Sequence, residues 1–193
     1  MRRYRTLIIG GVARAGKSIL AQRVAERLNI SRIPGDSFVS TFEGLYPEHG
    51  ICHDAAHEII CQNVQEFFIR FWKSSRWDEN YDFVFDTFHI HPRLLPLERL
   101  GPEYAFLFLG YAELSPEAML LRARTHPNPN DWTRERGDAE LLSLFANWIA
   151  LSGEFRDVCA ARGLAYIDTS HDFEGAQNTA FTRALELMKW DGT

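Results

Sequence analysis

The stretch from residue 11 to residue 18, which reads GVARAGKS, constrains the fold of this chain more than any other. It fits the pattern G-x-x-x-x-G-K-[ST], with Gly11, Gly16, Lys17 and Ser18 in the fixed positions. The glycines let backbone N–H groups turn inward around a phosphate, and a helix that begins here points its positive end at the same place. The lysine reaches the β- and γ-phosphates, and the serine hydroxyl ligates Mg²⁺. The motif therefore requires a strand before the loop and a helix after it.

Lysine is rare in this chain, which makes its place in the motif informative. Only three of the 21 basic residues are lysines, and one of them stands at position 17. Residues 6–11 form an apolar run typical of a buried strand, and residues 17–28 carry apolar side chains at helical spacing. The motif thus has the context that phosphate binding needs. We expect ATP to be bound by Gly11, Val12, Ala13, Arg14, Ala15, Gly16, Lys17, Ser18 and Ile19.

The rest of the chain alternates between short apolar runs and longer stretches with helical periodicity. This alternation predicts an α/β domain whose mostly parallel sheet is covered by helices on both faces. A length of 193 residues suits one such domain. Ser115 is expected to cap one helix and Gly163 to end the next. Strands are expected at 30–34, 81–86, 104–110 and 164–168. Further helices are expected at 53–77, 115–124 and 138–162, and a final helix follows the last strand and runs to about residue 190.

Composition argues against several classes of function. The net charge of −5 provides no general basic face for a nucleic-acid polymer. The apolar run at residues 7–9 is too short for the core of a signal peptide, and no stretch approaches the ~20 apolar residues that span a membrane. The three cysteines form no C-x-x-C pair, which indicates reduced thiols and a cytoplasmic protein.

The chain lacks the marks of two other nucleotide-binding classes. It has no N-K-x-D motif for reading guanine, and its LSGE at residues 151–154 lies within a predicted helix, so chance explains the partial match to the LSGGQ of ABC ATPases. The N-terminal phosphate loop, the chain length and a later Arg-rich segment resemble the small P-loop kinases, which include nucleoside and nucleotide kinases and antibiotic kinases such as chloramphenicol phosphotransferase. The resemblance implies a three-layer fold with a five-stranded parallel sheet in the order 2-3-1-4-5. It also implies transfer of the γ-phosphoryl group of Mg²⁺-bound ATP to a small-molecule hydroxyl or phosphate.

The resemblance also assigns roles to parts of the single domain. Residues 37–77 would cover the acceptor, with Phe38 among its contacts, and residues 122–137 would form a lid over ATP. Arginine suits a lid because it is always charged and can bond phosphate oxygens in a fork. The alternative is a solvated turn with ordinary surface arginines. The candidate lid residues are Arg122, Arg134 and Arg136 as catalytic groups and Arg124 as an ATP contact.

Asp36 is the candidate catalytic base. It stands in the stretch PGDSF just after the second predicted strand, and the chloramphenicol kinase has a similar Gly-x-Asp-Ser stretch. In several kinases of this group an Asp at this point accepts the proton of the substrate hydroxyl, which requires a carboxylate within hydrogen-bond reach. Two alternatives stay open. Asp36 could cap a helix, or it could bind the substrate if the acceptor is already a phosphate.

Two histidines and an aspartate follow the third predicted strand. Asp86 ends the apolar run YDFVFD, which resembles a Walker B strand whose Asp positions Mg²⁺ together with Ser18; capping of the next turn is the alternative. His89 and His91 come next, at the strand end where open parallel sheets bind ligands. They are candidate substrate contacts or else ordinary loop histidines.

Weaker signals come from two further places. Ser170 follows the last strand, where kinases of this group contact adenine, although Ser170 or Asp172 could instead cap the last helix. His49, His53 and His57 are spaced at four, which allows a zinc site, but a wall of the acceptor site is the better interpretation.

The alternative function is a nucleotide-binding regulatory protein that has no acceptor. The missing N-K-x-D motif and the absence of an appended domain argue against it, while the lack of a recognisable acceptor motif argues for it. A toxin-like kinase that acts on a cell-wall nucleotide sugar would use the same fold and residues. The expected partners are ATP and a small molecule, with no nucleic-acid polymer and no membrane, and the chain is expected to be a monomer or a homodimer.

Overall fold

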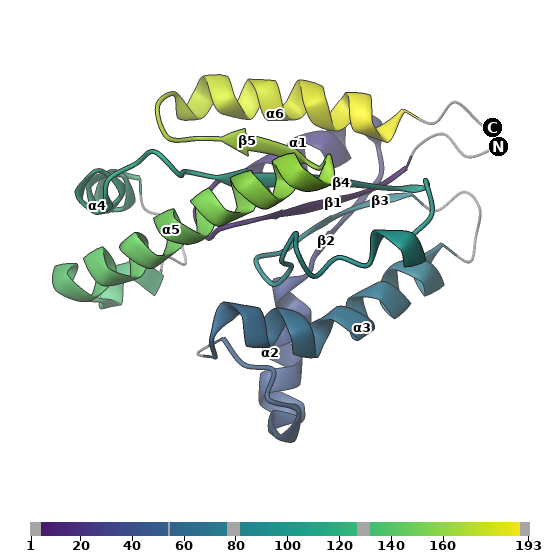
Figure 1. The fold of residues 1–193 in the computed structure, drawn as a ribbon, viewed down its shortest axis with the longest axis horizontal. Helices are drawn as coiled ribbons and strands as arrows, with labels where there is room; N and C mark the ends of the chain where they lie inside the picture. The colour runs from purple at the N-terminus through teal and green to yellow at the C-terminus, as the bar shows by residue number, and fades with distance from the viewer. Residues whose placement is uncertain (1–4, 54, 77–81, 127–131, 190–193) are drawn as a thin grey trace.

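The computed structural model describes residues 5–53, 55–76, 82–126 and 132–189. Its five parallel strands form one sheet in the order β2-β3-β1-β4-β5 (Figure 1). Both the α/β class and the strand order implied by the resemblance are confirmed. The strands are β1 (Thr6–Gly11), β2 (Ser31–Pro34), β3 (Phe83–Asp86), β4 (Tyr104–Gly110) and β5 (Ala165–Asp168).

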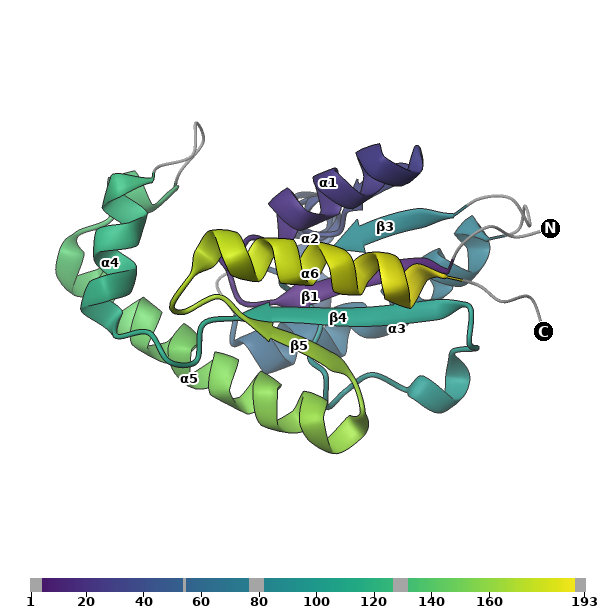
Figure 2. The same cartoon turned by 90° about the horizontal axis from the view of Figure 1, so that it is seen from above.

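Helices cover both faces of this sheet. Helices α1 and α6 lie on one face and α3 and α5 on the other, as the two views in Figures 1 and 2 show. Helix α4 packs against α5 beyond the carboxyl ends of the strands. The helices are α1 (Lys17–Leu28), α2 (Asp36–Leu45), α3 (His57–Ser75), α4 (Pro116–Thr125), α5 (Asp138–Arg162) and α6 (Phe173–Met188), with short 3₁₀ turns η1 (Pro47–His49), η2 (Leu97–Arg99) and η3 (Trp132–Glu135).

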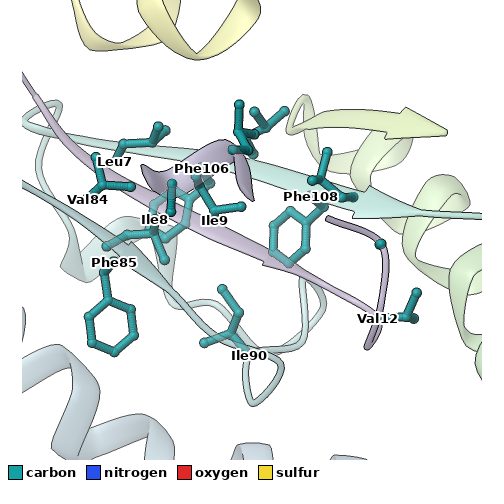
Figure 3. Close-up of a cluster of buried hydrophobic side chains, with 14 of the residues drawn as sticks. Leu7, Ile8, Ile9, Val12, Val84, Phe85, Ile90, Phe106 and Phe108 are labelled. Carbon is teal, nitrogen blue, oxygen red and sulfur yellow. The ribbon is translucent and has the colours of Figure 1, made fainter. Parts of the chain in front are cut away.

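The three central strands form the core because their side chains are apolar on both faces. Every residue of β1, β3 and β4 is buried, whereas the edge strands β2 and β5 are partly exposed. Figure 3 shows these side chains standing on both faces of the sheet. Phe85 points toward α3, where its ring centroid lies 5.0 Å from that of Phe68 and 5.5 Å from that of Trp72. Burial on both faces is the reason that these strands read as continuous apolar runs.

The predicted helix ends are largely confirmed. Ser115 caps α4, because its hydroxyl accepts a hydrogen bond of 3.2 Å from the Ala118 N–H. Gly163 ends α5 with a left-handed φ of 66°. Asp172 caps α6 by accepting from the Gly175 N–H at 2.9 Å, so of the two candidate caps of this helix Asp172 is the one in use.

The segment between β2 and α3 differs from expectation. Helix α2 has no counterpart among the predicted elements, because its sequence DSFVSTFEGL mixes β-branched, aromatic and glycine residues that disfavour helix locally. Packing stabilises it instead: the Phe38 ring lies 5.3 Å from Phe67 and 4.8 Å from Phe71 on α3. Helix α3 begins at His57 rather than at residue 53, after Ala56 in an extended conformation.

No helix in the described parts of the chain combines the length and the hydrophobicity that crossing a membrane requires.

Candidate active site

The predicted site residues of the first three strands gather at one edge of the sheet. The phosphate loop leaves the carboxyl end of β1, Asp36 follows β2, and Asp86 ends β3. Because β2, β3 and β1 are neighbours and parallel, their carboxyl ends lie together. This is the edge at which open α/β sheets bind ligands.

Glycine is required at two points of the phosphate loop. Gly11 has a φ of 127° and packs so closely on the Leu109 backbone that an added Cβ would collide with the Leu109 carbonyl. Gly16 has a φ of 89°, the left-handed conformation that turns the chain into α1. The N–H groups of the first turn of α1 have no acceptors within the helix and are free to bind phosphate oxygens.

Tyr111 and Arg14 fix the loop from outside. Tyr111 is fully buried after β4, and its hydroxyl donates to the Ala13 carbonyl at 2.9 Å. The Arg14 guanidinium donates to the His126 carbonyl at 3.1 Å, which connects the loop to the end of α4. The role of Tyr111 was not predicted, because no local pattern indicates which buried tyrosine reaches a loop 98 residues away in sequence.

The Lys17 side chain turns back onto the backbone of the loop. Its Nζ is buried and donates to the Val12 carbonyl at 2.8 Å. Burial lowers the pKa of Lys17, while the negative charges of Asp36 and Asp86 oppose that shift. A lysine held in this way is available to move onto the β- and γ-phosphates.

Asp86 is held by side chains on two sides. Its Oδ2 accepts from the Ser18 hydroxyl at 2.8 Å. Arg32 on β2 donates to both carboxylate oxygens, from Nε to Oδ1 at 2.8 Å and from Nη2 to Oδ2 at 3.0 Å. The structure thus brings together the two residues predicted to hold Mg²⁺. Arg32 was not predicted. The signal that could have identified it is a charged residue next to an apolar residue in a short strand.

Asp36 is the first residue of α2 rather than its N-cap, which is Gly35. Its Oδ1 accepts from the Thr87 hydroxyl at 2.8 Å and from the Phe88 N–H at 3.0 Å. Its Oδ2 accepts no hydrogen bond from the part of the chain that the structure describes, and the side chain is 51% exposed. One oxygen is therefore fixed, and the other accepts no hydrogen bond from the described residues. The capping alternative finds no support in this geometry.

The charge of Asp36 is set by its neighbours. Burial raises the pKa of this carboxyl, but the positive charge of Lys17, then His89, and the bonds from Phe88 and Thr87 outweigh burial, so the pKa lies below its ordinary value. Asp36 is therefore ionised at neutral pH. An ionised carboxylate can accept a hydrogen bond or a proton from a hydroxyl placed beside it.

Histidines surround the Asp36 carboxylate. The His89 Nε2 lies 3.8 Å from Asp36 Oδ1, and the His53 ring lies 5.1 Å from the His89 ring. The His57 Nε2 donates a hydrogen bond of 2.8 Å to the Phe88 carbonyl oxygen. Burial lowers the pKa of both His57 and His89 to about 4, so these two rings are neutral at pH 7.

His91 is placed differently from His89. It is buried, and its Nε2 lies 3.2 Å from Glu154 on α5. The two histidines thus lie on either side of the loop after β3, and His89 is the one beside Asp36. Phe38 packs into the aromatic cluster between α2 and α3, close to Phe67 and Phe71.

The zinc alternative finds no site. Within the ranges that the structure describes, no group of three or more His, Cys, Asp or Glu residues is arranged to hold a metal ion. His53 lies within 2.9 Å of the Ser40 hydroxyl, and His57 approaches the Cys61 sulfur at 3.4 Å. These contacts place the histidines in the wall between α2 and α3.

The predicted lid arginines divide into two groups. Arg122 donates to the carbonyls of Thr169 and Ser170 at 3.0 and 2.8 Å, so it lies beside the loop between β5 and α6. Arg124 donates to Asp138 at 2.6 Å and to the Thr133 carbonyl at 2.8 Å, which joins the end of α4 to the start of α5. In this structure these hydrogen bonds of both guanidinium groups go to oxygens outside the phosphate loop.

The other two lid arginines lie on the far side of a segment, residues 127–131, that is outside the described part of the chain. Arg134 is exposed on η3. Arg136 pairs with Glu140 and lies over the Trp132 ring at 5.3 Å. The predicted break HPNPND is therefore preceded by Arg124 and followed by Arg136, each of which is paired with an acidic residue of α5.

The loop after β5 is held by Asp168, a residue that sequence reasoning did not select. Its carboxylate accepts from the Ala112 N–H at 2.9 Å and from the Ser170 N–H at 2.8 Å. The Ser170 hydroxyl accepts from the Glu113 N–H at 3.0 Å. This network joins the carboxyl ends of β4 and β5, and it leaves the Ser170 carbonyl to Arg122.

A parallel sheet of this strand order, with a phosphate loop between its central strand and α1, is the fold of the small P-loop kinases. Among solved structures, the chain is similar to a shikimate kinase from Bacteroides thetaiotaomicron, with a TM-score of 0.58 and 17% identity over 95% of this chain and 98% of that one. It is also similar to a gluconokinase from Sinorhizobium meliloti 1021, with a TM-score of 0.54 and 17% identity over 97% and 95% of the two chains. At such identity the likeness establishes the fold.

Comparison with protein-family models gives no match, and comparison with curated proteins gives none either.

Proposed function

We propose that this protein is an ATP-dependent phosphotransferase that acts on a hydroxyl group of a small molecule. The observation that carries the proposal is the half-exposed Asp36 carboxylate, which stands beside the phosphate loop and keeps one oxygen fixed and the other without a hydrogen bond from the described residues. A kinase needs a carboxylate at this place to accept the proton of the attacking hydroxyl.

The roles of the remaining groups follow from their positions. The loop from Gly11 to Ser18 would hold the phosphates of ATP, with Lys17 released from the Val12 carbonyl to bond them. Ser18 and Asp86, already joined by a hydrogen bond, would hold Mg²⁺ directly or through water. Hard oxygen donors of this kind fit Mg²⁺.

The transfer step balances without any further reagent. The acceptor oxygen forms a bond to the γ-phosphorus while the bond from that phosphorus to the β-bridging oxygen breaks. The acceptor proton passes to Asp36, and ADP leaves with the electron pair of the broken bond. The arginines of the 122–137 segment would stabilise the transferring group after a movement of the lid, since Arg122 and Arg124 bond protein oxygens in this structure.

The test is ATP consumption by the purified protein with Mg²⁺, measured with and without a panel of nucleosides, sugars, amino alcohols and hydroxy acids. One acceptor should raise turnover well above the basal rate. Tight ATP binding with no stimulation by any acceptor would favour the regulatory alternative.

Lys17→Ala provides the first prediction, with Lys73→Ala as its matched control because Lys73 is exposed on α3. The first variant should lose at least about a hundredfold in kcat/KM, since an interaction with the transferring phosphoryl group is removed. The second should match the wild type. Equal activity of the two variants would contradict the role of the loop.

A further inference from the structure

The segment that covers Asp36 has an unusual charge. Residues 33–69 contain no lysine and no arginine, although they contain six acidic residues. This stretch includes all of α2 and the first two-thirds of α3. In a chain with 21 basic residues, a run of this length without one leaves a whole wall of the site with no permanent positive charge.

Contacts link this segment to Asp36 through His89, whose Nε2 lies 3.8 Å from Asp36 Oδ1. The Ser40 hydroxyl of α2 lies 2.9 Å from His53 Nε2, and the His53 ring packs 5.1 Å from His89, the neighbour of Asp36. Glu43, on the next turn of α2, lies 4.0 Å from the same His53 nitrogen and is 40% exposed. The side chains of this segment that lie near His89 are thus the hydroxyl of Ser40, the carboxylate of Glu43 and the imidazole of His53.

The cations near this edge of the sheet are occupied by other roles. Lys17 belongs to the phosphate loop, and Arg32 has its fork on both oxygens of Asp86. Arg93, after β3, pairs with Glu154. Among the described residues of this wall, the exposed ionic side chains that lie near His89, Asp36 and Glu43, are both anions, and a carboxylate or phosphate on the acceptor would meet them.

Aromatic side chains also lie beside Asp36, beginning in the loop after β3. Phe88 donates its backbone N–H to Asp36, and its ring lies 6.0 Å from Trp148 on α5. Trp148 in turn lies 5.7 Å from Trp132 on η3, which is 40% exposed. A row of rings thus runs from beside the candidate base to the candidate lid. Such a row binds apolar or planar groups and attracts amines through the ring faces.

We propose that the acceptor is an alcohol without negative charge, either uncharged or amine-bearing, with an apolar or planar part that lies on the Phe88–Trp148–Trp132 row. The inference rests on the proposed function and adds the substrate class. Its physical basis is that binding a carboxylate or phosphate requires fork or point cations to offset the lost hydration, and the acceptor wall has none. An amine would instead gain attraction from Asp36 and Glu43.

The first test uses acceptors that share a benzylic alcohol and differ in the charge of the group next to it. Phenylethanediol, amino-phenylethanol and mandelate share a phenyl ring and a benzylic hydroxyl and are neutral, cationic and anionic. A deproteinised metabolite extract, separated beforehand by ion exchange into anionic, neutral and cationic pools, is assayed beside them with ATP labelled at the γ-phosphate. Label should enter acceptors of the neutral or cationic set, and the Lys17→Ala variant should abolish it.

The outcomes separate the two proposals. Label that enters chiefly mandelate or the anionic pool would overturn the inference on charge while establishing the kinase activity. Label in no acceptor of any pool would overturn the proposed function, and the inference with it.

A pair of charge-reversed variants tests the wall directly. Glu43→Lys adds a cation next to His53, and Glu48→Lys makes the same change on the exposed turn η1. Glu43→Lys should lower kcat/KM for an amine-bearing acceptor about tenfold, as expected for one charge at a partly exposed site, and leave the KM for ATP unchanged. Glu48→Lys should match the wild type. Equal effects of the two variants would contradict the assignment of α2 to the acceptor wall.

Discussion

At the scale of single residues, the two aspartates of the site differ in how many of their carboxylate oxygens accept hydrogen bonds. Asp36 follows β2 and Asp86 ends β3, yet Asp86 has both oxygens bonded and is buried, whereas the half-exposed Asp36 has one oxygen without a hydrogen bond from the described residues. The first geometry suits a group that fixes a metal or a hydroxyl in place. The second suits a group that must receive a proton from a molecule that comes and goes.

Asp36→Asn tests this division of labour. The amide oxygen can still accept from Thr87 and Phe88, so the fold and the affinity for ATP should be nearly unchanged. The amide cannot take a proton, so the transfer rate should fall by about 10²–10⁴-fold. Asp157→Asn is the control, because Asp157 is exposed on α5 and pairs only locally with Arg156. Unchanged transfer in Asp36→Asn would contradict the role of base, and loss of folding would indicate a structural role.

At the scale of elements, one aromatic cluster positions helix α2. Phe85 of β3 is fully buried and lies within 6.3 Å of ring centroids on both α2 and α3, including Phe38 and Phe68. Through this cluster the sheet holds α2, and α2 holds Asp36. Helix α2 is therefore a product of packing, since its own sequence favours helix only weakly.

Phe85→Ala should lower the free energy of unfolding by about 3–5 kcal/mol, because the deletion leaves a cavity lined by rings that cannot all move in. Urea denaturation followed by fluorescence measures the change. Leu121→Ala, at a site 66% exposed on α4, should stay within about 0.5 kcal/mol of the wild type. If Phe85→Ala does not fold, Phe85→Leu should show a smaller loss in the same direction. A loss no larger than that of Leu121→Ala would contradict the role of the cluster.

At the scale of the whole molecule, buried neutral histidines connect stability to pH. Burial lowers the pKa of His57 and His89 to about 4, against 6.5 for an ordinary histidine, and the pKa of His91 shifts in the same direction. Between these values the unfolded chain binds more protons than the folded one. Stability must therefore rise with pH across this window and level off above it.

The free energy of unfolding should accordingly increase from pH 4 to about 6.5 and change little from pH 7 to 8. Urea denaturation at a series of pH values measures the slope. His89→Gln should reduce the slope, whereas His171→Gln should not, because His171 is 79% exposed. A flat profile between pH 4 and 6.5 would show that the folded protein accepts these protons as readily as the unfolded chain.

The sequence by itself determined the features that depend on short-range pattern. The phosphate loop, the alternation of strands and helices, the Ser115 cap and the Gly163 stop are all set within a few residues, so the motif and the periodicity were enough to predict them. Ser18 and Asp86 could be paired in advance because strand ends of a parallel sheet converge.

Only the tertiary structure decided the contacts made across long stretches of sequence. Arg32 reaches Asp86, Tyr111 reaches Ala13, and Arg122 turns to Thr169. Helix α2 forms for the same reason, since its stability comes from rings on α3 and β3 rather than from its own residues. The strand order and register fix these distances, and no local preference of the chain encodes which arginine, tyrosine or aromatic ring will stand opposite which partner.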